Sequence, residues 1–149
     1  MSNETIIQLK DANIFQNEHL ILSNVNLELT KGSFRYLIGQ TGSGKSSLLK
    51  TLYGDLILRQ GSGKVCGFVL EELKEKNIPL LRRKMGIVFQ DFQLLTDRNV
   101  FDNLLFVLKA TGWKEKDKMQ TRVEEVLTKV DMKTKGFKFP HELSGGEQQ

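Results

Sequence analysis

Cysteine is nearly absent from this sequence, because Cys66 is the only one among 149 residues. A single cysteine cannot form a disulfide within the chain or build a cysteine-rich metal site. We therefore expect Cys66 to be a small apolar residue of a protein from a reducing compartment. Long apolar runs are missing as well, since no stretch approaches the roughly 20 apolar residues that a membrane-spanning helix needs. No apolar run follows a basic start, so we expect no signal peptide.

A strong excess of one charge is also missing. Lys and Arg total 22, Asp and Glu total 18, and the formal net charge is +4. Because the basic residues form no dense stripe, we expect no nucleic-acid partner. The 39% of hydrophobic and 27% of charged residues are typical of a globular chain that buries a core. A length of 149 residues suggests one domain or a large part of one.

Apolar patterns predict strands in the first part of the chain. The alternation at residues 25–29 indicates a strand with one buried face. The short apolar runs at residues 34–38 and 86–89 indicate strands that are buried on both faces. Residues 61–63 (Gly-Ser-Gly) predict a loop, and residues 65–69 predict a further strand.

Helical periods follow these strands. Residues 46–53 predict a helix with Leu48, Leu49 and Leu52 on one face. Apolar residues at helical spacing recur through roughly residues 98–133, which predicts a pair of amphipathic helices. The sequence therefore combines an early strand-rich part with a later helical part, and we expect an α/β fold.

Residues 39–46 fit the pattern G-x-x-x-x-G-K-[ST] of a phosphate-binding loop. The glycines of such a loop let the backbone approach a phosphate, and its N–H groups and the following helix attract the anion. Lys45 can reach the β- and γ-phosphates, and the Ser46 hydroxyl is a hard ligand for Mg²⁺. We expect this phosphate loop to bind Mg-ATP through Gly39, Gln40, Thr41, Gly42, Ser43, Gly44, Lys45, Ser46 and the neighbouring Ser47.

A glycine-rich turn could match that pattern by accident. The surroundings argue against an accident, because an apolar run precedes the phosphate loop and a helical period follows it. Residues 143–149 (Leu-Ser-Gly-Gly-Glu-Gln-Gln), here called the signature segment, supply a second glycine-rich motif. Ser144 can cap a helix there, and N–H groups at a helix start can bind an anion.

Three segments together resemble the nucleotide-binding domain of ABC transporters. They are GQTGSGKSS at residues 39–47, GIVFQD at 86–91 and LSGGEQQ at 143–149. In that family, segments of this kind stand in the same order as the Walker A, Q-loop and signature motifs. The resemblance covers essentially the whole chain, and its three motifs make it specific.

The resemblance implies a P-loop NTPase (ABC ATPase) core with a mixed sheet, an antiparallel β-subdomain and a helical subdomain. We expect the β-subdomain at residues 1–32, the core at 33–90, the helical subdomain at 91–142 and the signature segment at 143–149. We also expect the domain to be C-terminally incomplete.

Residues 80–104, which begin LLRRK, most resemble the bacterial cell-division subfamily FtsE, whose integral membrane partner is FtsX. The resemblance implies a homodimeric ATP-binding subunit that acts on an FtsX-like integral membrane subunit, as a peripheral protein on the cytoplasmic side of the inner membrane. An ATPase of a lipoprotein-release or macrolide-export transporter, and a soluble ABC-type ATP switch, remain the alternatives.

The family also implies roles for single residues. Phe15 falls where the family has a tyrosine that stacks on adenine. The alternative interpretation, that Phe15 is an aromatic residue of the core, is equally well supported. Gln90 matches the Q-loop glutamine, which contacts Mg²⁺ and senses the γ-phosphate. The alternative is that Gln90 is only a polar residue at the end of a strand. Ser144, Gly145 and Gly146 match the signature motif, which contacts the ATP held by the other subunit.

Some catalytic groups of the family have no counterpart in this sequence. Lys45 and Gln90 are present, but the Walker B aspartate, the water-activating glutamate and the switch histidine are not found. His19 and His141 do not stand at the switch position. We therefore expect the chain to be the N-terminal part of such a domain, which binds ATP but is deficient in hydrolysis.

Overall fold

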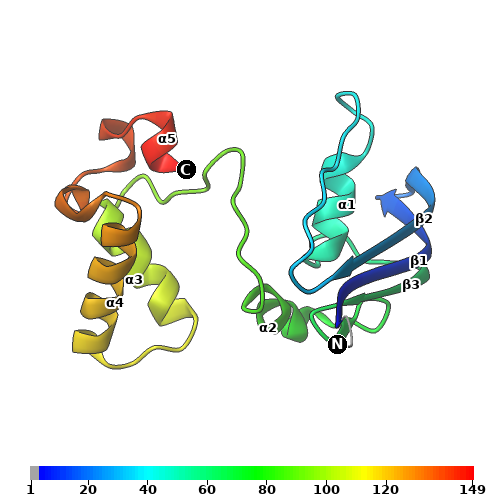
Figure 1. Cartoon of the computed structure of the whole chain (residues 1–149), viewed down its shortest axis with the longest axis horizontal. Coiled ribbons are helices and arrows are strands. Elements are labelled where there is room, and N and C mark those ends of the chain that lie inside the picture. The colour runs from blue at the N-terminus through cyan, green and yellow to red at the C-terminus, as the bar shows by residue number, and fades with distance from the viewer. Residues whose placement is uncertain (1–3) are drawn as a thin grey trace. The chain divides into compact units, whose positions relative to one another are not determined.

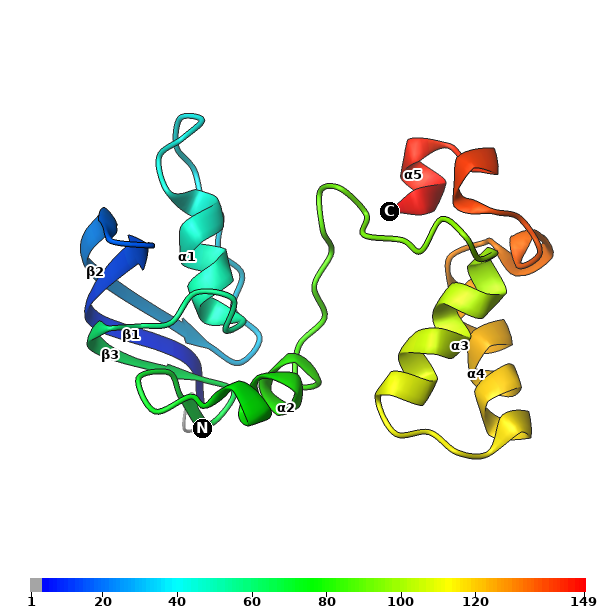
Figure 2. The same cartoon turned by 180° about the vertical axis from the view of Figure 1, so that it is seen from behind.

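The computed structural model describes residues 4–149, and the chain divides into two units after Gly86 (Figures 1 and 2). The sheet and the first helices belong to the first unit, and the remaining helices belong to the second. Among the described residues, no helix is both long and apolar enough to cross a bilayer. Each unit is described by itself below.

A four-stranded antiparallel sheet forms the centre of the first unit, with the strand order β2-β1-β3-β4. The strands are β1 (Thr5–Gln16), β2 (His19–Thr30), β3 (Gln60–Val65) and β4 (Phe68–Val69). The helical segments of this unit are α1 (Lys45–Leu52), the 3-10 turn η1 (Glu75–Asn77) and α2 (Ile78–Arg82). The strand predicted at residues 25–29 is confirmed as part of β2.

The core of the first unit lies between the sheet and α1. Leu9 and Val65 of the sheet are almost completely buried in one cluster with Leu48 and Leu52 of α1. Leu49, however, is 51% exposed, so the prediction that it shares the core face is wrong. One step along a helix turns a side chain by about 100°, which takes Leu49 out of the buried stripe.

Two segments that the sequence predicts as buried strands are irregular: residues 34–38 are exposed, and residues 86–89 alternate between exposed and half-buried. Phe34, Ile38 and Val88 are 73%, 88% and 69% exposed. A strand needs a neighbour that pairs with its N–H and C=O groups, and neither segment has one among the described residues. The mixed sheet predicted for the core is therefore not formed there, and the sheet that forms is purely antiparallel.

Strand β3 corrects the prediction of a loop at residues 61–63, because all three residues lie inside it. A Cβ atom at Gly63 would lie 2.8 Å from the Leu9 side chain and 2.9 Å from that of Leu70. Glycine here allows close packing of β3 against two leucines and does not break the strand. The single strand predicted at residues 65–69 is divided by a two-residue turn between β3 and β4.

The second unit is helical. Its two longer helices, α3 and α4, lie side by side in both views (Figures 1 and 2). Its helical segments are α3 (Val100–Ala110), α4 (Lys116–Lys129), the 3-10 turns η2 (Lys133–Lys135) and η3 (Pro140–Glu142), and α5 (Gly145–Gln148). The helix pair predicted within residues 98–133 is therefore confirmed.

Helix α4 supplies most of the buried side chains of this unit. Met119, Val123 and Leu127 recur at helical spacing and are 3%, 0% and 5% exposed. Val107 of α3 and Val130 after α4 belong to the same apolar periods but are 55% and 62% exposed. The apolar period of the sequence thus predicts the helices and their main buried stripe, while residues at the edges of the stripe are exposed to solvent.

One side chain ties the segment before α3 to that helix. The Asn103 Oδ1 atom accepts a hydrogen bond from the Leu95 N–H at 2.8 Å. Its amide nitrogen donates to the carbonyls of Leu95, Arg98 and Asn99 at 3.0, 3.1 and 3.0 Å. Asn99 in turn caps α3, because its Oδ1 accepts from the Asp102 N–H. These bonds fix the chain between residues 95 and 99.

Candidate functional site

The phosphate loop of the first unit, residues 39–46, turns directly into α1. Gly42 and Gly44 have φ angles of 82° and 86°, which glycine adopts without a steric penalty. Gly44 is also the N-cap of α1, and a Cβ atom there would lie 2.9 Å from the Leu22 side chain of β2. The backbone conformation and the contact with β2 therefore both require glycine at position 44.

Lys45 folds back over this loop. Its Nζ donates to the carbonyls of Gly39 and Gln40 at 2.7 and 2.6 Å, and lies 3.4 Å from the Ser43 Oγ. Lys45 as a residue is half-buried, and its ammonium group lies against the backbone of the loop. A cation in this place, next to the first N–H groups of α1, is the electrostatic arrangement that a phosphate group requires.

The two serines after Lys45 have different environments. Ser46 is exposed at the loop, whereas Ser47 is 8% exposed and faces the core with Leu48. Of the two hydroxyls, the Ser46 hydroxyl is therefore the one that an incoming Mg²⁺ ion can reach. The carbonyl of Ser47 accepts a hydrogen bond from the Thr51 hydroxyl at 2.9 Å, one turn further along α1.

Phe15 lies on β1 near the point where the sheet meets the phosphate loop. It pairs with Leu20 in the β1–β2 hairpin and is partly exposed. The neighbouring pair in the register joins Ile14 to Leu22, the residue that lies against Gly44. Because side chains alternate along a strand, the buried Ile14 faces the core and Phe15 faces the other side of the sheet; its role in stacking on adenine stays a prediction.

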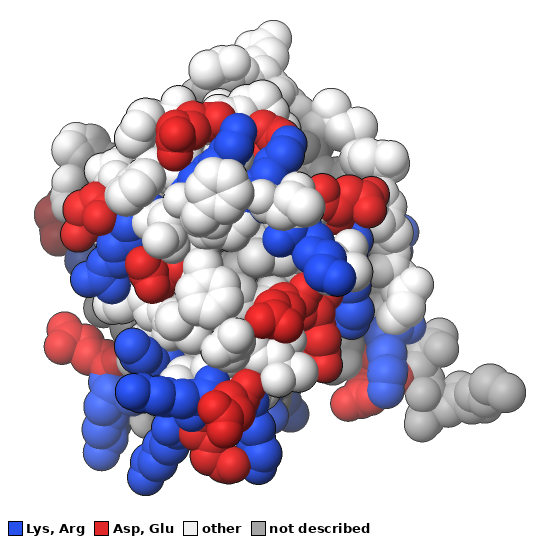
Figure 3. All heavy atoms as spheres, turned by 90° about the vertical axis from the view of Figure 1, so that its left-hand side faces the viewer, with Lys and Arg blue, Asp and Glu red and all other residues white. Residues whose placement is uncertain are grey.

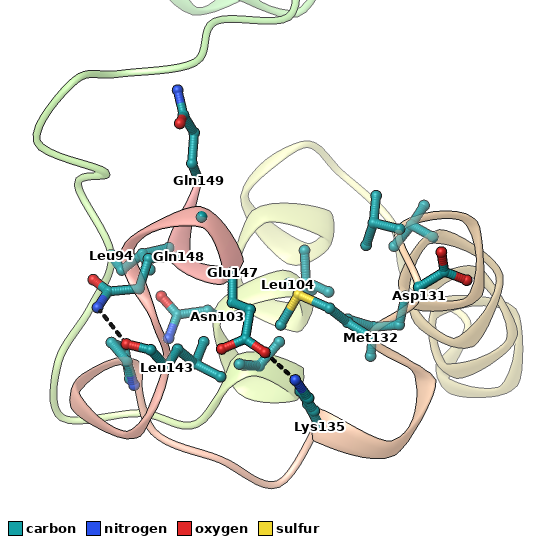
Figure 4. A pocket seen from close by; sticks show the side chains of 16 residues that line it. Leu94, Asn103, Leu104, Asp131, Met132, Lys135, Leu143, Glu147, Gln148 and Gln149 are labelled. Carbon is teal, nitrogen blue, oxygen red and sulfur yellow. Dashed lines mark hydrogen bonds and ion pairs between the residues drawn. The ribbon is translucent and has the colours of Figure 1, made fainter.

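The signature segment of the second unit forms the turn into α5, with Ser144 as N-cap. The Ser144 N–H and hydroxyl both donate to the Glu147 Oε2 at 2.8 Å. The Lys135 Nζ donates to the other carboxylate oxygen, Oε1 (Figure 4). The hydrogen bond from Lys135 is the main cause that lowers the pKa of Glu147 from 4.5 to about 2, and the two Ser144 donors add to it.

The profile of the ABC transporter family matches residues 22–149 of this sequence, which include both the phosphate loop and the signature segment. The chain belongs to the ABC transporter family. Its fold agrees, because the dimeric structure of the bacterial ABC transporter cassette MJ0796 superimposes with a TM-score of 0.83 at 27% identity. That match covers 95% of this chain and 65% of the cassette.

Two similar proteins are longer than this chain. The cell division ATP-binding protein FtsE of Streptococcus pneumoniae is 39% identical over 146 residues, which are 97% of this chain and 63% of that protein. The methionine import ATP-binding protein MetN of Helicobacter pylori is 40% identical over 147 residues, which are 97% of this chain and 44% of that protein. The chain therefore spans less than two thirds of each.

Gln90, the predicted Q-loop residue, is exposed and lies with Asp91 in a turn of the second unit, and residues 92–95 after it are irregular. Phe92 and Gln93 have φ angles of 57° and 49°, so two consecutive residues adopt the left-handed conformation that L-residues disfavour. A Cβ atom at Gly145 would lie 4.0 Å from the Phe92 ring. Phe92, in the segment after Gln90, therefore lies close to Gly145 of the signature segment.

Sequence reasoning missed three side chains of the second unit: Asn103, Lys135 and Glu147. The Ser-x-x-Glu spacing of Ser144 and Glu147 is that of a capping box, so Glu147 could have been found from the sequence. Nothing in the sequence pairs Lys135 with Glu147 across 12 positions, because that contact depends on how the chain returns after α4.

Charged side chains do not separate by sign on the face of the molecule that Figure 3 shows. Acidic and basic groups are interspersed across it. The eight ion pairs of the described residues include short-range pairs on α4, such as Arg122 with Glu125 at 2.9 Å. Such a mixed surface is typical of a solvated face, not of a surface built for a polyanion.

Proposed function

We propose that this chain is the Mg-ATP-binding part of an ABC-type membrane complex, and that the complex serves cell division as an FtsE-like ATPase. The observation that carries the proposal is the phosphate loop, whose glycine-dependent turn surrounds the Lys45 ammonium at the start of α1. The 39% identity to FtsE over 97% of the chain supports the cell-division assignment.

The residues of the phosphate loop fit a nucleotide. The Lys45 ammonium has three N–H donors. In this structure it donates to two loop carbonyls and lies near the Ser43 hydroxyl, and the same donors can bind phosphate oxygens instead. Gly39 to Gly44 supply backbone N–H groups, Ser46 supplies an exposed hydroxyl for Mg²⁺, and Phe15 supplies a ring for adenine. Bound Mg²⁺ would neutralise phosphate charge, while Lys45 and the loop orient the phosphates.

The proposal includes two partners. A second copy of the chain would place its signature segment, with Ser144, Gly145 and Gly146, on the ATP of the first copy; the dimeric relative supports this arrangement. An FtsX-like integral membrane subunit would contact the segment after Gln90, where the backbone of Phe92 and Gln93 is left-handed. Gln90 would report the state of the γ-phosphate and Mg²⁺ to that segment.

A second candidate function is the ATPase of an importer. The observation that favours it is the 40% identity to MetN over 147 residues, which equals the identity to FtsE within one per cent. Association with an FtsX-like protein and association with an importer permease are therefore the two outcomes that a membrane pull-down would separate.

We further propose that the 149-residue chain binds ATP but hydrolyses it poorly. Lys45, Ser46 and Gln90 can hold the nucleotide and its metal, but no residue of this sequence corresponds to the family's water-activating glutamate. Loss of a positioned general base commonly lowers a rate by about 10²–10⁴-fold.

The test is titration of the purified chain with a fluorescent ATP analogue, with and without Mg²⁺, followed by competition with unlabelled ATP and ADP. We expect saturable binding that Mg²⁺ strengthens and that unlabelled ATP reverses. Absence of nucleotide binding would exclude the proposed function, whereas binding accompanied by turnover at the rate of longer family members would exclude only the proposed deficiency.

A further inference from the structure

Ser144 has no free donor in this structure. Its N–H and its hydroxyl both point to one oxygen, the Glu147 Oε2, at 2.8 Å each. A serine hydroxyl carries a single proton, so it can donate one hydrogen bond at a time. A phosphate oxygen that is to accept a hydrogen bond from the Ser144 hydroxyl must therefore replace Glu147.

Glu147 is fixed in this position from its other side. Its second oxygen, Oε1, accepts from the Lys135 Nζ, and the two side chains are 29% and 34% exposed (Figure 4). Lys135 belongs to η2, a separate turn from the α5 turn that holds Glu147. Both side chains line a cavity of about 660 Å³ whose wall includes Leu104, Met132 and Leu143. This apolar surrounding limits the positions that the carboxylate can take.

We propose that Glu147, positioned by Lys135, is an internal ligand of Ser144 that a nucleotide phosphate brought by a second copy of the chain must displace. The inference rests on the proposed function and adds to it a residue that limits ATP-driven association. The carboxylate competes in two ways: it accepts the hydrogen bond of the Ser144 hydroxyl, and its negative charge repels the incoming phosphate. Glu147 and Lys135 are thus positioning residues and do not themselves bind nucleotide.

The experiment measures ATP-driven dimerisation of the intact protein by sedimentation, in wild type and in Glu147→Gln. The amide is nearly isosteric and uncharged, so its bond to Ser144 is weaker than that of a carboxylate. We expect ATP-driven association to tighten by about five- to tenfold, because a weaker neutral hydrogen bond replaces the charge-assisted one. With ADP, which brings no γ-phosphate, association should be the same in both proteins.

Glu142→Gln is the matched control. Glu142 also caps a turn through its carboxylate, which accepts from the Phe139 N–H at 2.7 Å, but it does not contact Ser144. The substitution changes the net charge equally and should leave ATP-driven association unchanged. An equal gain in both variants would show a general charge effect and would overturn the proposal.

Two further variants separate the outcomes. Ser144→Ala in the Glu147→Gln background should remove most of the gain, since the released hydroxyl is its main source and only the effect of the lost charge remains. Glu147→Asp keeps the charge but is one methylene shorter, so it cannot hold Ser144 and Lys135 together; if Glu147→Gln folds poorly, this variant should show a smaller gain in the same direction. Unchanged or weaker ATP-driven association in both Glu147 variants would overturn the proposal, whereas failure of wild type to bind nucleotide would overturn the proposed function itself.

Discussion

Lys45 is the residue on which the phosphate loop most depends, because its ammonium lies within reach of three loop oxygens. Lys45→Ala removes this charged donor, and a hydrogen bond to a charged group contributes about 1.5–3 kcal/mol. We expect ATP affinity to fall by about ten- to a hundredfold in a fluorescence titration. Lys50→Ala, a neighbouring substitution on α1 at a solvent-accessible ion pair with Asp55, should leave affinity unchanged. Equal affinity in Lys45→Ala and wild type would contradict the assignment of the loop.

Glu147 makes the stability of the second unit depend on pH. Its pKa is lowered from 4.5 to about 2, mainly by the hydrogen bond from Lys135 and then by those from Ser144. A lowered carboxyl pKa stabilises the folded state fully above the unfolded value, and this contribution is lost as pH falls from about 4.5 through about 2. We therefore expect the free energy of unfolding of wild type to decrease across this window.

Urea unfolding at about pH 5 and about pH 3, followed by circular dichroism, measures this dependence. Glu147→Gln should lose less stability than wild type between the two values, because it has no proton to take up at this position. Lys135→Gln should behave similarly, since Lys135 is the main cause of the lowered pKa. Identical acid sensitivity in all three proteins would show that Glu147 is not the responsible group.

At the scale of elements, β1 and β3 approach each other closely at Gly61. This glycine has a φ of 85°, and a Cβ atom there would lie 2.4 Å from the Asp11 carbonyl oxygen and 2.6 Å from the Ala12 Cα. Gly67, in the turn to β4, has a similar φ of 89° but nothing within 4 Å of its Cβ position. The two glycines thus share a positive φ but differ in the room around the Cβ position.

Alanine substitutions at these two glycines separate the cost of a positive φ from the cost of steric overlap with neighbouring atoms. Gly67→Ala should lower the free energy of unfolding by about 1–2 kcal/mol, the penalty of a left-handed residue. Gly61→Ala should lower it by a further 1–3 kcal/mol or so, because backbone atoms must also move. Thermal or urea unfolding of both variants gives the comparison. Equal losses would contradict the close approach of β1 and β3.

Asn103 determines whether the segment before α3 stays attached to that helix. Asn103→Ala removes the four hydrogen bonds to residues 95–99 and leaves partly buried backbone groups without partners. We expect the free energy of unfolding of the second unit to fall by about 1–3 kcal/mol. Hydrogen exchange should show faster exchange of the Leu95 amide. Gln120→Ala, which removes one exposed bond to Glu124, is the control and should change little.

Elements with a clear local period and a partner in the fold could be predicted from the sequence. The strand at residues 25–29, α1 and the pair α3 and α4 follow from such periods, and each buries apolar side chains against another element. Residues 34–38 have an equally clear apolar pattern but have no strand to pair with in the part of the chain that the structure describes. Local pattern therefore predicts the tendency to form a strand, while strand formation also requires the partner.

The candidate site divides in the same way. The phosphate loop and the Ser144 cap depend on glycine, lysine and serine at fixed local spacing, so the sequence alone indicates both. Lys135 and the contact between Phe92 and Gly145 depend on tertiary packing across the second unit. The burial of Ser47, a predicted phosphate ligand, likewise follows from the side of α1 that meets the sheet.

At the scale of the whole molecule, the two apolar segments give the chain an unusual surface. Residues 34–38 and 86–89 are irregular and expose side chains that are normally buried. Phe34 and Tyr36 contact each other edge to face, with ring centroids 4.8 Å apart, and are 73% and 81% exposed. Clustered exposed apolar groups bind hydrophobic dyes and promote association of chains.

The purified chain should therefore bind an extrinsic hydrophobic dye such as anilinonaphthalene sulfonate under native conditions. Phe34→Ser combined with Ile38→Ser should lower the dye fluorescence while the melting midpoint of the first unit stays within a few degrees, because the two side chains are 73% and 88% exposed and contribute little to the core. Phe137→Ser removes a ring that is 71% exposed in the second unit and should lower the fluorescence much less. A double variant that melts well below wild type would show that residues 34–38 are packed in solution, in a strand that has found a partner.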